Sequence, residues 1–207
     1  MENNNPVNQK VQMEQQVPNM CDPQAAHDYL ITTFPKQVRV LSDMGCKFFS
    51  ERGIDPEVAR QKGVFSLKQR NGSESIAFVY HENGLDHSIK TRGVEVKRFA
   101  AMPTGAKQIP YNADVIGKFR YWIVTEGEND ALAFMAAGFE ASSSTPNGGG
   151  PRELKWLEAY KKQLEQVEII YIATDTDAKG NELAAVLIAE LGSKRCRRVS
   201  FGDCKDA

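Results

Sequence analysis

The segment Tyr121-Trp122-Ile123-Val124-Thr125-Glu126-Gly127-Glu128-Asn129-Asp130 gives the clearest indication of the fold. Its first four residues are bulky and apolar, which is typical of a buried strand. The acidic and glycine residues after them predict a tight turn, and Asn129 to Ala137 then predicts a helix that Gly138 ends. A strand followed directly by a helix is the basic unit of an α/β fold with a mainly parallel sheet.

A second segment of the same kind lies about 50 residues further on. Residues 168–173 predict another buried strand, and Asp175-Thr176-Asp177-Ala178-Lys179-Gly180 follows it directly. A helix is expected over 181–191, ended by Gly192. Both acidic clusters begin where a strand ends, and open parallel sheets place their ligand sites at that edge. Further elements expected in this half are a helix over 152–166 and a strand over 198–201.

The acidic clusters predict a metal site. If the two strands are neighbours, Glu126, Asp175 and Asp177 project into one crevice and can hold one or two Mg²⁺ ions. Either cluster alone is equally consistent with helix N-caps or solvated turn residues. A calcium loop is the weaker alternative, because the second segment lacks the full run of oxygen ligands and follows a strand.

The preceding part of the chain has a different pattern. Helices are expected over 23–33, 38–52 and 54–60, and alternating apolar residues then surround Asn71-Gly72 and Asn83-Gly84. Asn-Gly between apolar runs predicts β-hairpins, because both turn residues must accept positive φ. The sequence thus predicts three parts: a disordered tail rich in Asn and Gln, a small α+β lobe, and an α/β lobe, over 1–20, 21–118 and 119–207.

Charge is distributed unevenly between these parts. The net charge is only −1, from 26 Lys and Arg against 27 Asp and Glu. Residues 60–107 nevertheless contain nine Lys or Arg against four acids, whereas residues 121–145 contain four acids and no Lys or Arg. A basic lobe beside an acidic one suits a nucleotide polymer together with divalent cations. Ordinary solvated charge on a strand face is the alternative.

Several other functions receive no support from the sequence. The four cysteines are scattered without a C-x-x-C pair, which predicts reduced thiols and no zinc ribbon. The three histidines show no ligand spacing and are interpreted as structural or surface residues. No apolar run reaches the roughly 20 residues that a membrane helix needs, and no signal pattern precedes the chain, so a cytoplasmic protein with no membrane partner is expected.

The acidic segments carry a family resemblance. A strand followed by Glu126-Gly127-x-x-Asp130, and a strand followed by Asp175-x-Asp177-x-x-Gly180, resemble the Toprim motif of primases, topoisomerases and some nucleases. Residues 45–207 resemble phage-type and Twinkle-like primase-helicases, through Phe49-Ser50-Glu51-Arg52-Gly53-Ile54, the stretch 76–92 and Cys204-Lys205-Asp206-Ala207. Two parts of such proteins are missing here: the zinc module, and the Gly-Lys-Ser/Thr phosphate loop of the helicase motor.

The resemblance implies a function and its residues. It implies a Toprim domain at 119–207 behind a basic primase subdomain at 21–118, and Mg²⁺-dependent (or Mn²⁺-dependent) synthesis of RNA primers from ribonucleoside triphosphates on single-stranded DNA. Glu126, Asp175 and Asp177 would be the catalytic and metal-binding acids. In such proteins the sequence like 205–207 continues as Asn-Glu, which implies a longer parent chain with a helicase domain and makes Asp206 a candidate metal ligand. Candidate phosphate contacts, by position, are Lys90, Arg92, Lys97, Arg98 and Lys107.

Three alternatives remain at this point. A Toprim nuclease would use the same carboxylates to cleave DNA. A catalytically silent Twinkle-like module would bind DNA and support a helicase. A topoisomerase fragment fits least well, because the basic lobe resembles the primase arrangement and no strand-passing tyrosine is apparent.

Overall fold

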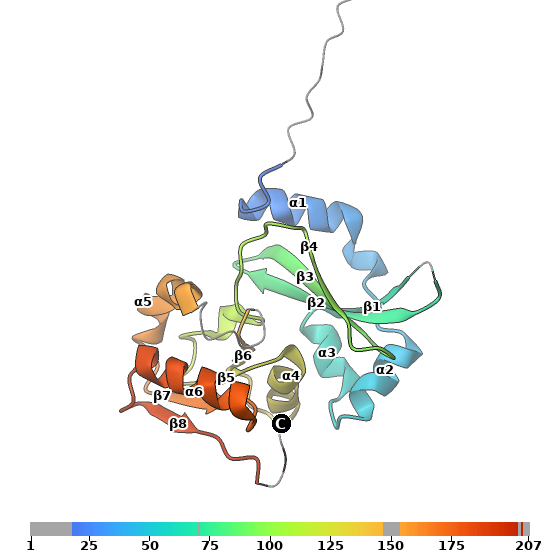
Figure 1. The fold of residues 1–207 in the computed structure, drawn as a ribbon. Coiled ribbons are helices and arrows are strands. Elements are labelled where there is room, and N and C mark those ends of the chain that lie inside the picture. Colours follow the sequence, from blue (N-terminus) through green and yellow to red (C-terminus); the bar gives the residue numbers. More distant parts are fainter. Residues whose placement is uncertain (1–17, 70, 147–153, 203, 205–207) are drawn as a thin grey trace, which may run out of the picture.

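The computed structural model describes residues 18–69, 71–146, 154–202 and 204, and two four-stranded sheets organise them. The first sheet is antiparallel, with the order β1-β2-β3-β4, and its strands are Val64–Lys68, Glu74–Glu82, Leu85–Gly93 and Phe99–Met102. The second is parallel, with the order β6-β5-β7-β8, and its strands in chain order are Tyr121–Thr125 (β5), Ser142–Ser144 (β6), Ile169–Ala173 (β7) and Cys196–Arg198 (β8). Figure 1 shows the two sheets in separate halves of the molecule.

Helices cover both sheets. Helices α1 (Pro23–Thr33), α2 (Asp43–Ser50) and α3 (Pro56–Gln61) pack around the antiparallel sheet, with α1 lying over β3. Helices α4 (Glu128–Ala136) and α6 (Ala178–Leu191) pack on the parallel sheet. The short helices are η1, η2, η3 and α5, at Lys36–Val38, Ala113–Val115, Leu154–Tyr160 and Lys161–Leu164. No helix in the described ranges is both long and apolar enough to cross a bilayer.

One apolar core joins the two sheets. Phe78 and Tyr80 of β2 belong to the same buried cluster as Trp122 and Val124 of β5. Tyr111, on the connection between the sheets, packs edge-on against the rings of both Phe78 and Tyr80. A smaller cluster, which includes Leu30 of α1, lies on the other face of the antiparallel sheet. The residues that face the main core thus hold the parallel sheet against β2.

Most sequence predictions for the elements are confirmed, and the mixed α/β fold with a parallel sheet is as expected. The helix at 23–33 has the predicted bounds, Asp55 caps α3, and Asn83-Gly84 forms the turn between β2 and β3 with both residues at positive φ. Gly138 and Gly192, which were expected to end helices, also have positive φ. Local signals were sufficient here because each of these caps and turns depends on adjacent residues.

Three predicted elements were wrong in their bounds. The helix expected over 38–52 begins only at Asp43, because Ser42 caps it and the Val40 carbonyl instead accepts a hydrogen bond from Ser66 N at the edge of β1. In the helix expected over 152–166, residues 154–160 form a 3₁₀ helix and only 161–164 are α-helical. The last strand begins at Cys196, because Ile170 of β7 pairs with Cys196.

Strands β4 and β6 were missed. Strand β6 consists of Ser142, Ser143 and Ser144, which have little intrinsic strand preference, and all three are buried. Hydrogen bonds stabilise them there: Trp122 Nε1 donates to Ser143 Oγ at 2.7 Å, and Asn112 Nδ2 donates to Ser142 O at 2.9 Å. The tail expected over 1–20 lies mostly outside the described residues.

Candidate active site

The two acidic segments meet at the carboxyl edge of the parallel sheet. Strands β5 and β7 are hydrogen-bonded neighbours, and Thr125 pairs with Ala173 at the last position of each. Glu126 therefore leaves β5 at the level where Thr174 leaves β7, and Asp175 follows by one residue. Because parallel strands lie about 4.8 Å apart, the backbones of these acids start from adjacent positions on one edge. The neighbouring arrangement expected from the sequence is present.

Buried threonines hold both turns in place. Thr125 Oγ1 donates to the Gly127 carbonyl at 3.0 Å, and Thr174 Oγ1 donates to the Gly180 carbonyl at 2.6 Å. Neither side chain is exposed to solvent. These hydroxyls are thereby satisfied although they are buried, and each adds a side-chain hydrogen bond to a carbonyl at the start of α4 or α6.

The Glu126 turn is closed by Asp130. Asp130 Oδ2 accepts a hydrogen bond from Gly127 N at 3.0 Å, as in a capping box at the start of α4. The Glu126 carbonyl accepts from Thr145 Oγ1 at 3.2 Å, which ties this turn to the residue after β6. Asp130 thus supports the backbone beside Glu126, and Glu126 itself is half-buried.

The Asp175–Gly180 turn is tighter. Asp177 is the N-cap of α6, and its Oδ1 accepts from Gly180 N at 3.0 Å. A Cβ on Gly180 would lie 2.2 Å from the Asp175 carbonyl oxygen, so no larger residue fits without moving the backbone. Glycine at this position allows Asp175 and the start of α6 to approach each other.

Arg198 is a neighbour of Asp175 that sequence reasoning did not select. Its Nη2 donates to the Asp175 carbonyl at 2.8 Å and its Nη1 to the Ile172 carbonyl at 3.0 Å. Burial lowers the pKa of Arg198, and the negative charge of Asp175 opposes that shift. Strand β8, which contains Arg198, is the last strand of its sheet, next to β7.

By their chemistry, the acids at this edge fit a hard divalent cation. Mg²⁺ takes one or two carboxylates and completes its shell with water and substrate phosphates. Within the described ranges, no three or more His, Cys, Asp or Glu side chains are grouped so that they could hold a metal ion. Asp206, the further candidate ligand, lies outside those ranges. Glu126, Asp175 and Asp177 thus share an edge of the sheet without forming a closed set of three ligands.

A buried ion pair links the two sheets next to this edge. Lys90 Nζ, from β3, lies 2.7 Å from Glu128 Oε1 at the start of α4. The Tyr80 hydroxyl, from β2, donates to the same carboxylate oxygen. The Glu128 side chain is 6% exposed and that of Lys90 is 18% exposed. Burial, and then the charge of Glu128, raises the pKa of Tyr80 well above its ordinary value, so this phenol remains a donor.

Glu128 was counted among the acids of the segment but was not selected as a site residue. The only sequence feature that could have identified Glu128 is its position two residues after Glu126, on the first turn of a helix. That position gave no indication that its partners come from strands about 40 residues earlier. Lys90 was selected, and the structure places it beside the acidic edge.

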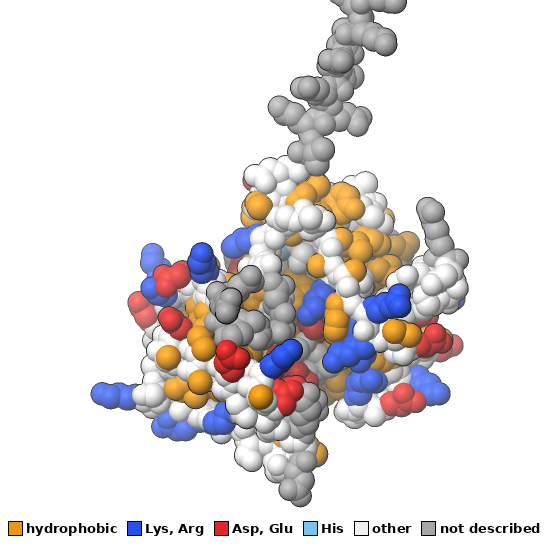
Figure 2. Space-filling view, in the orientation of Figure 1, with side chains coloured by type: hydrophobic (Ala, Val, Ile, Leu, Met, Phe, Trp, Pro, Cys, Tyr) orange, Lys and Arg blue, Asp and Glu red, His pale blue; other side chains and the backbone are white. Residues whose placement is uncertain are grey.

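The remaining predicted cations surround the same region. The Arg92 guanidinium lies 4.7 Å from the centre of the Phe48 ring, and burial together with nearby Arg52 lowers the pKa of Arg92. Lys97 Nζ lies 5.9 Å from the Phe99 ring centre. Lys107 Nζ lies 3.6 Å from Glu82 Oε2, and Arg98 is exposed. Figure 2 shows Lys and Arg side chains gathered over α2 and β4, with hydrophobic side chains between them.

A pocket of about 250 Å³ lies beside the ion pair of Lys90 and Glu128. Lys90 and Lys107 line it together with Tyr80, Ser88 and Pro146. The pocket therefore contains two of the five predicted phosphate contacts and directly adjoins Glu128 through Tyr80 and Lys90.

Comparisons with known proteins agree with this arrangement. Residues 123–207 match a family model described as Toprim-like. A Twinkle homolog protein, chloroplastic/mitochondrial, from Arabidopsis thaliana is 30% identical over 195 residues, which is 87% of this chain and 27% of that protein. A primase homolog protein from the same plant is 30% identical over 193 residues, 87% of this chain and 56% of that protein. The chain thus spans about a quarter to just over half of these relatives.

Solved structures show the same fold. The primase fragment of the bacteriophage T7 primase-helicase protein superposes with a TM-score of 0.66 at 24% identity, covering 76% of this chain and 65% of that one. The Aquifex aeolicus primase, with its zinc-binding and RNA polymerase domains, gives 0.65 at 14% identity, covering 92% and 57%. At these identities the likeness concerns the fold. This chain therefore contains a Toprim domain within a primase-like fold, and it is homologous to the Twinkle homolog and primase homolog proteins.

Proposed function

We propose that this chain is the primer-synthesising part of a primase, joining ribonucleotides on a single-stranded DNA template. The observation that carries the proposal is the pairing of Thr125 with Ala173, which starts Glu126 and Asp175 from adjacent positions on one sheet edge. A pocket lined by Lys90 and Lys107 contacts Glu128, two residues after Glu126, through Lys90 and Tyr80. Acidic side chains beside a cationic pocket suit a reaction between a polyanionic strand and a triphosphate.

In the proposed reaction the 3′-hydroxyl of one nucleotide attacks the α-phosphorus of the next, and pyrophosphate leaves. Mg²⁺ or Mn²⁺ held by Glu126, Asp175 and Asp177, with Asp206 as a further candidate, would supply charge neutralisation and a lower pKa for the attacking hydroxyl. Lys90 and Lys107 bind triphosphate oxygens from the pocket. Arg92, Lys97 and Arg98 hold the phosphates of the template strand along β3 and β4.

In this proposal, the contacts of Glu128 with Lys90 and Tyr80 position the Lys90 ammonium group. The ion pair fixes the Lys90 ammonium group at the wall of the pocket and leaves two of its three N–H donors for a ligand. The Tyr80 phenol remains protonated beside it and donates to the carboxylate. A helicase in the parent chain, as the Twinkle relative suggests, and a cytoplasmic location remain part of the proposal.

Primer synthesis by the Asp175→Asn and Asp177→Asn variants tests this function. Each variant should lower Mg²⁺-dependent incorporation of labelled ribonucleotides on single-stranded DNA by on the order of 100-fold or more, because a carboxylate is lost from the metal site. Asparagine is also a good N-cap, so Asp177→Asn keeps α6 capped. Glu182→Gln, an exposed acid on α6 away from the strand end, is the matched control and should keep full activity.

The same assay separates the alternatives. Undiminished synthesis by both Asn variants would remove the metal-site assignment. Cleavage of labelled DNA that needs Mg²⁺ and the same two aspartates, without synthesis, would identify a nuclease. Binding of DNA with neither reaction would identify a silent module.

A further inference from the structure

A second and larger pocket is lined by residues of α3, β1, β2 and the segment 111–118. Its volume is about 560 Å³. Val79, which lines it, belongs to the small apolar cluster with Leu30, whereas Val64 and Tyr111 belong to the main core, so the pocket lies at the margin of the antiparallel sheet. Its described lining shares no residue with the pocket of Lys90 and Lys107. The second pocket is therefore distinct from the pocket of the proposed active site.

This pocket is strongly basic. Two carboxylates line it, from Asp86 and Asp114, and they are outnumbered by five cationic side chains, those of Lys36, Arg39, Arg60, Lys62 and Lys118. Lys36 and Lys118 are exposed. Charges of one sign that converge on a concave surface create a positive potential that attracts anions.

Arg39 is a buried cation with an unused donor. Its side chain is only 10% exposed. Arg39 Nε donates to the Phe34 carbonyl at 2.8 Å, and Nη1 lies 2.7 Å from Asp86 Oδ2. Nη2 has no hydrogen-bond partner among the residues that the structure describes. Buried N–H groups without partners are uncommon because their desolvation is costly, and an oxyanion would satisfy this one.

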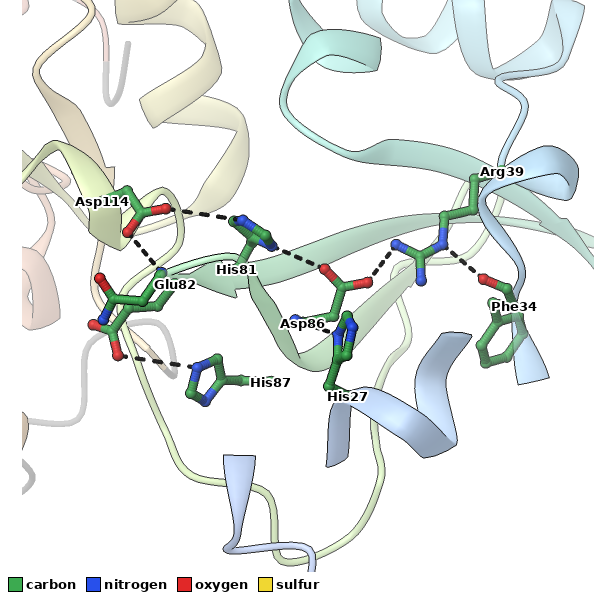
Figure 3. Close-up of polar contacts among 9 residues, drawn as sticks. His27, Phe34, Arg39, His81, Glu82, Asp86, His87 and Asp114 are labelled. Atoms are coloured by element: carbon green, nitrogen blue, oxygen red, sulfur yellow. Dashed lines mark hydrogen bonds and ion pairs between the residues drawn. The ribbon is translucent and has the colours of Figure 1, made fainter. Parts of the chain in front are cut away.

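The surrounding network holds Arg39 in place (Figure 3). Asp86 Oδ1 lies 2.9 Å from His81 Nδ1, and the Asp86 backbone N–H donates to His27 Nδ1 at 3.0 Å. Burial alone would raise the pKa of Asp86, but hydrogen bonds from His81 and Arg39 lower it overall. Asp86 is therefore a fixed anion whose two oxygens face His81 and Arg39, and the guanidinium is oriented before any ligand arrives.

We propose that this pocket is a binding site for a compact polyphosphate group, such as the triphosphate of a nucleotide, with Arg39 as its buried anchor. The planar guanidinium suits phosphate oxygens, and exposed Lys36 and Lys118 supply further positive charge. The volume lies within the range of small-ligand pockets. A single nucleic-acid strand is a poorer fit, because such sites present aromatic side chains for base stacking. Tyr111, the one aromatic residue in the described lining, is 1% exposed.

Calorimetric titration with inorganic tripolyphosphate in metal-free buffer tests the proposal. The double variant Lys36→Glu/Lys118→Glu should bind tripolyphosphate at least about tenfold more weakly than the natural chain, because two attractive charges become repulsive. The control Lys162→Glu/Lys194→Glu changes the net charge equally at exposed positions of the Toprim half and should change binding less than about twofold. Equal weakening in both double variants, or none in the first, would overturn the site.

Arg39→Lys provides the second variant. Lysine retains a cation for Asp86 but lacks the forked donor, so tripolyphosphate binding should fall several-fold while the melting temperature changes little. Asp175→Asn should bind tripolyphosphate normally, which makes failure of this site distinguishable from failure of the proposed active site. Full binding by Arg39→Lys, or binding of oligo(dT) without binding of tripolyphosphate, would contradict the assignment.

Discussion

At the scale of single residues, the ion pair between Lys90 and Glu128 has the strongest consequences. Both side chains are largely buried, and Tyr80 donates to the same carboxylate. Removing one partner of a buried pair leaves a charge without compensation, which costs more than the pair contributes. Stability, and in the proposed function also activity, therefore depend on the same contact.

A double-mutant cycle on Lys90→Met and Glu128→Gln measures that contact. Each single change should lower the free energy of unfolding in urea by about 2–4 kcal/mol, and the double variant should lose less than the sum because no charge is left unpaired. The matched control is the exposed pair Lys47–Glu51, 3.7 Å apart on α2, whose coupling should stay below about 0.5 kcal/mol. Additive single losses would show that Lys90 and Glu128 do not interact in solution.

Position 180 requires glycine because the backbone of Asp175 lies very close to it. The Asp175 carbonyl occupies the space that a side chain would need, at 2.2 Å from an added Cβ. Gly127 meets only the flexible Asp130 carboxylate, at 3.0 Å. Of the two glycines in the acidic motifs, only Gly180 is required by a close backbone contact, because a larger residue there would overlap the Asp175 carbonyl.

At the scale of elements, Asp177 combines a structural role with a proposed metal-binding role, and the sequence motif alone does not distinguish the two. It caps α6 through Gly180 N, and it is a proposed metal ligand. The capping role belongs to the helix and needs any good acceptor, whereas the metal role needs a negative charge.

Asp177→Ala and Asp177→Asn separate these roles. The alanine variant should lose about 1 kcal/mol of unfolding free energy, and the asparagine variant only a few tenths, because asparagine still caps the helix. Both should lose primer synthesis. Asp55→Ala, which removes the cap of α3, is the control: it should cost a similar free energy and leave synthesis intact. Normal synthesis by Asp177→Ala would show that Asp177 is a cap alone.

At the scale of the whole molecule, buried phenols join the two sheets. Tyr80 and Tyr111 lie in the shared core, and Tyr160 of η3 donates to Glu82 Oε1 of β2 at 2.5 Å. Burial raises the pKa of all three, and negative charge from Glu128 or Glu82 adds to the shift. Their neutral forms stabilise the fold below the unfolded-state pKa of about 10, and this contribution is lost as pH rises above it.

An alkaline titration checks this linkage. The ultraviolet absorbance change from Tyr80 and Tyr111 should appear only together with loss of the far-ultraviolet circular dichroism signal, above about pH 10. Tyr80→Phe and Tyr111→Phe should each reduce the amplitude of that joint step. Ionisation of every tyrosine before any loss of secondary structure would contradict the burial of these phenols. Because both sheets share the core, one cooperative transition is expected.

Much of the architecture could be predicted from local sequence. The strand before Glu126, the strand before Asp175, the Asp55 cap and the Asn83-Gly84 turn each depend on residues that are adjacent in the chain. Strand β6 could not be predicted, because three serines form a strand only where β5 offers a parallel partner and Trp122 a donor. The late start of the helix predicted over 38–52 likewise depends on Ser66, which lies well outside that segment.

The amino-acid sequence by itself determined that two acidic turns follow two buried strands, because strand period and glycine placement act over a few residues. Tertiary structure alone decided that those strands are neighbours, that Glu128 takes Lys90 and Tyr80 as partners, and that Arg39 is buried beside Asp86 in a second pocket. The physical reason is distance along the chain. Packing, burial and charge pairing between distant segments exist only once the core has brought them together.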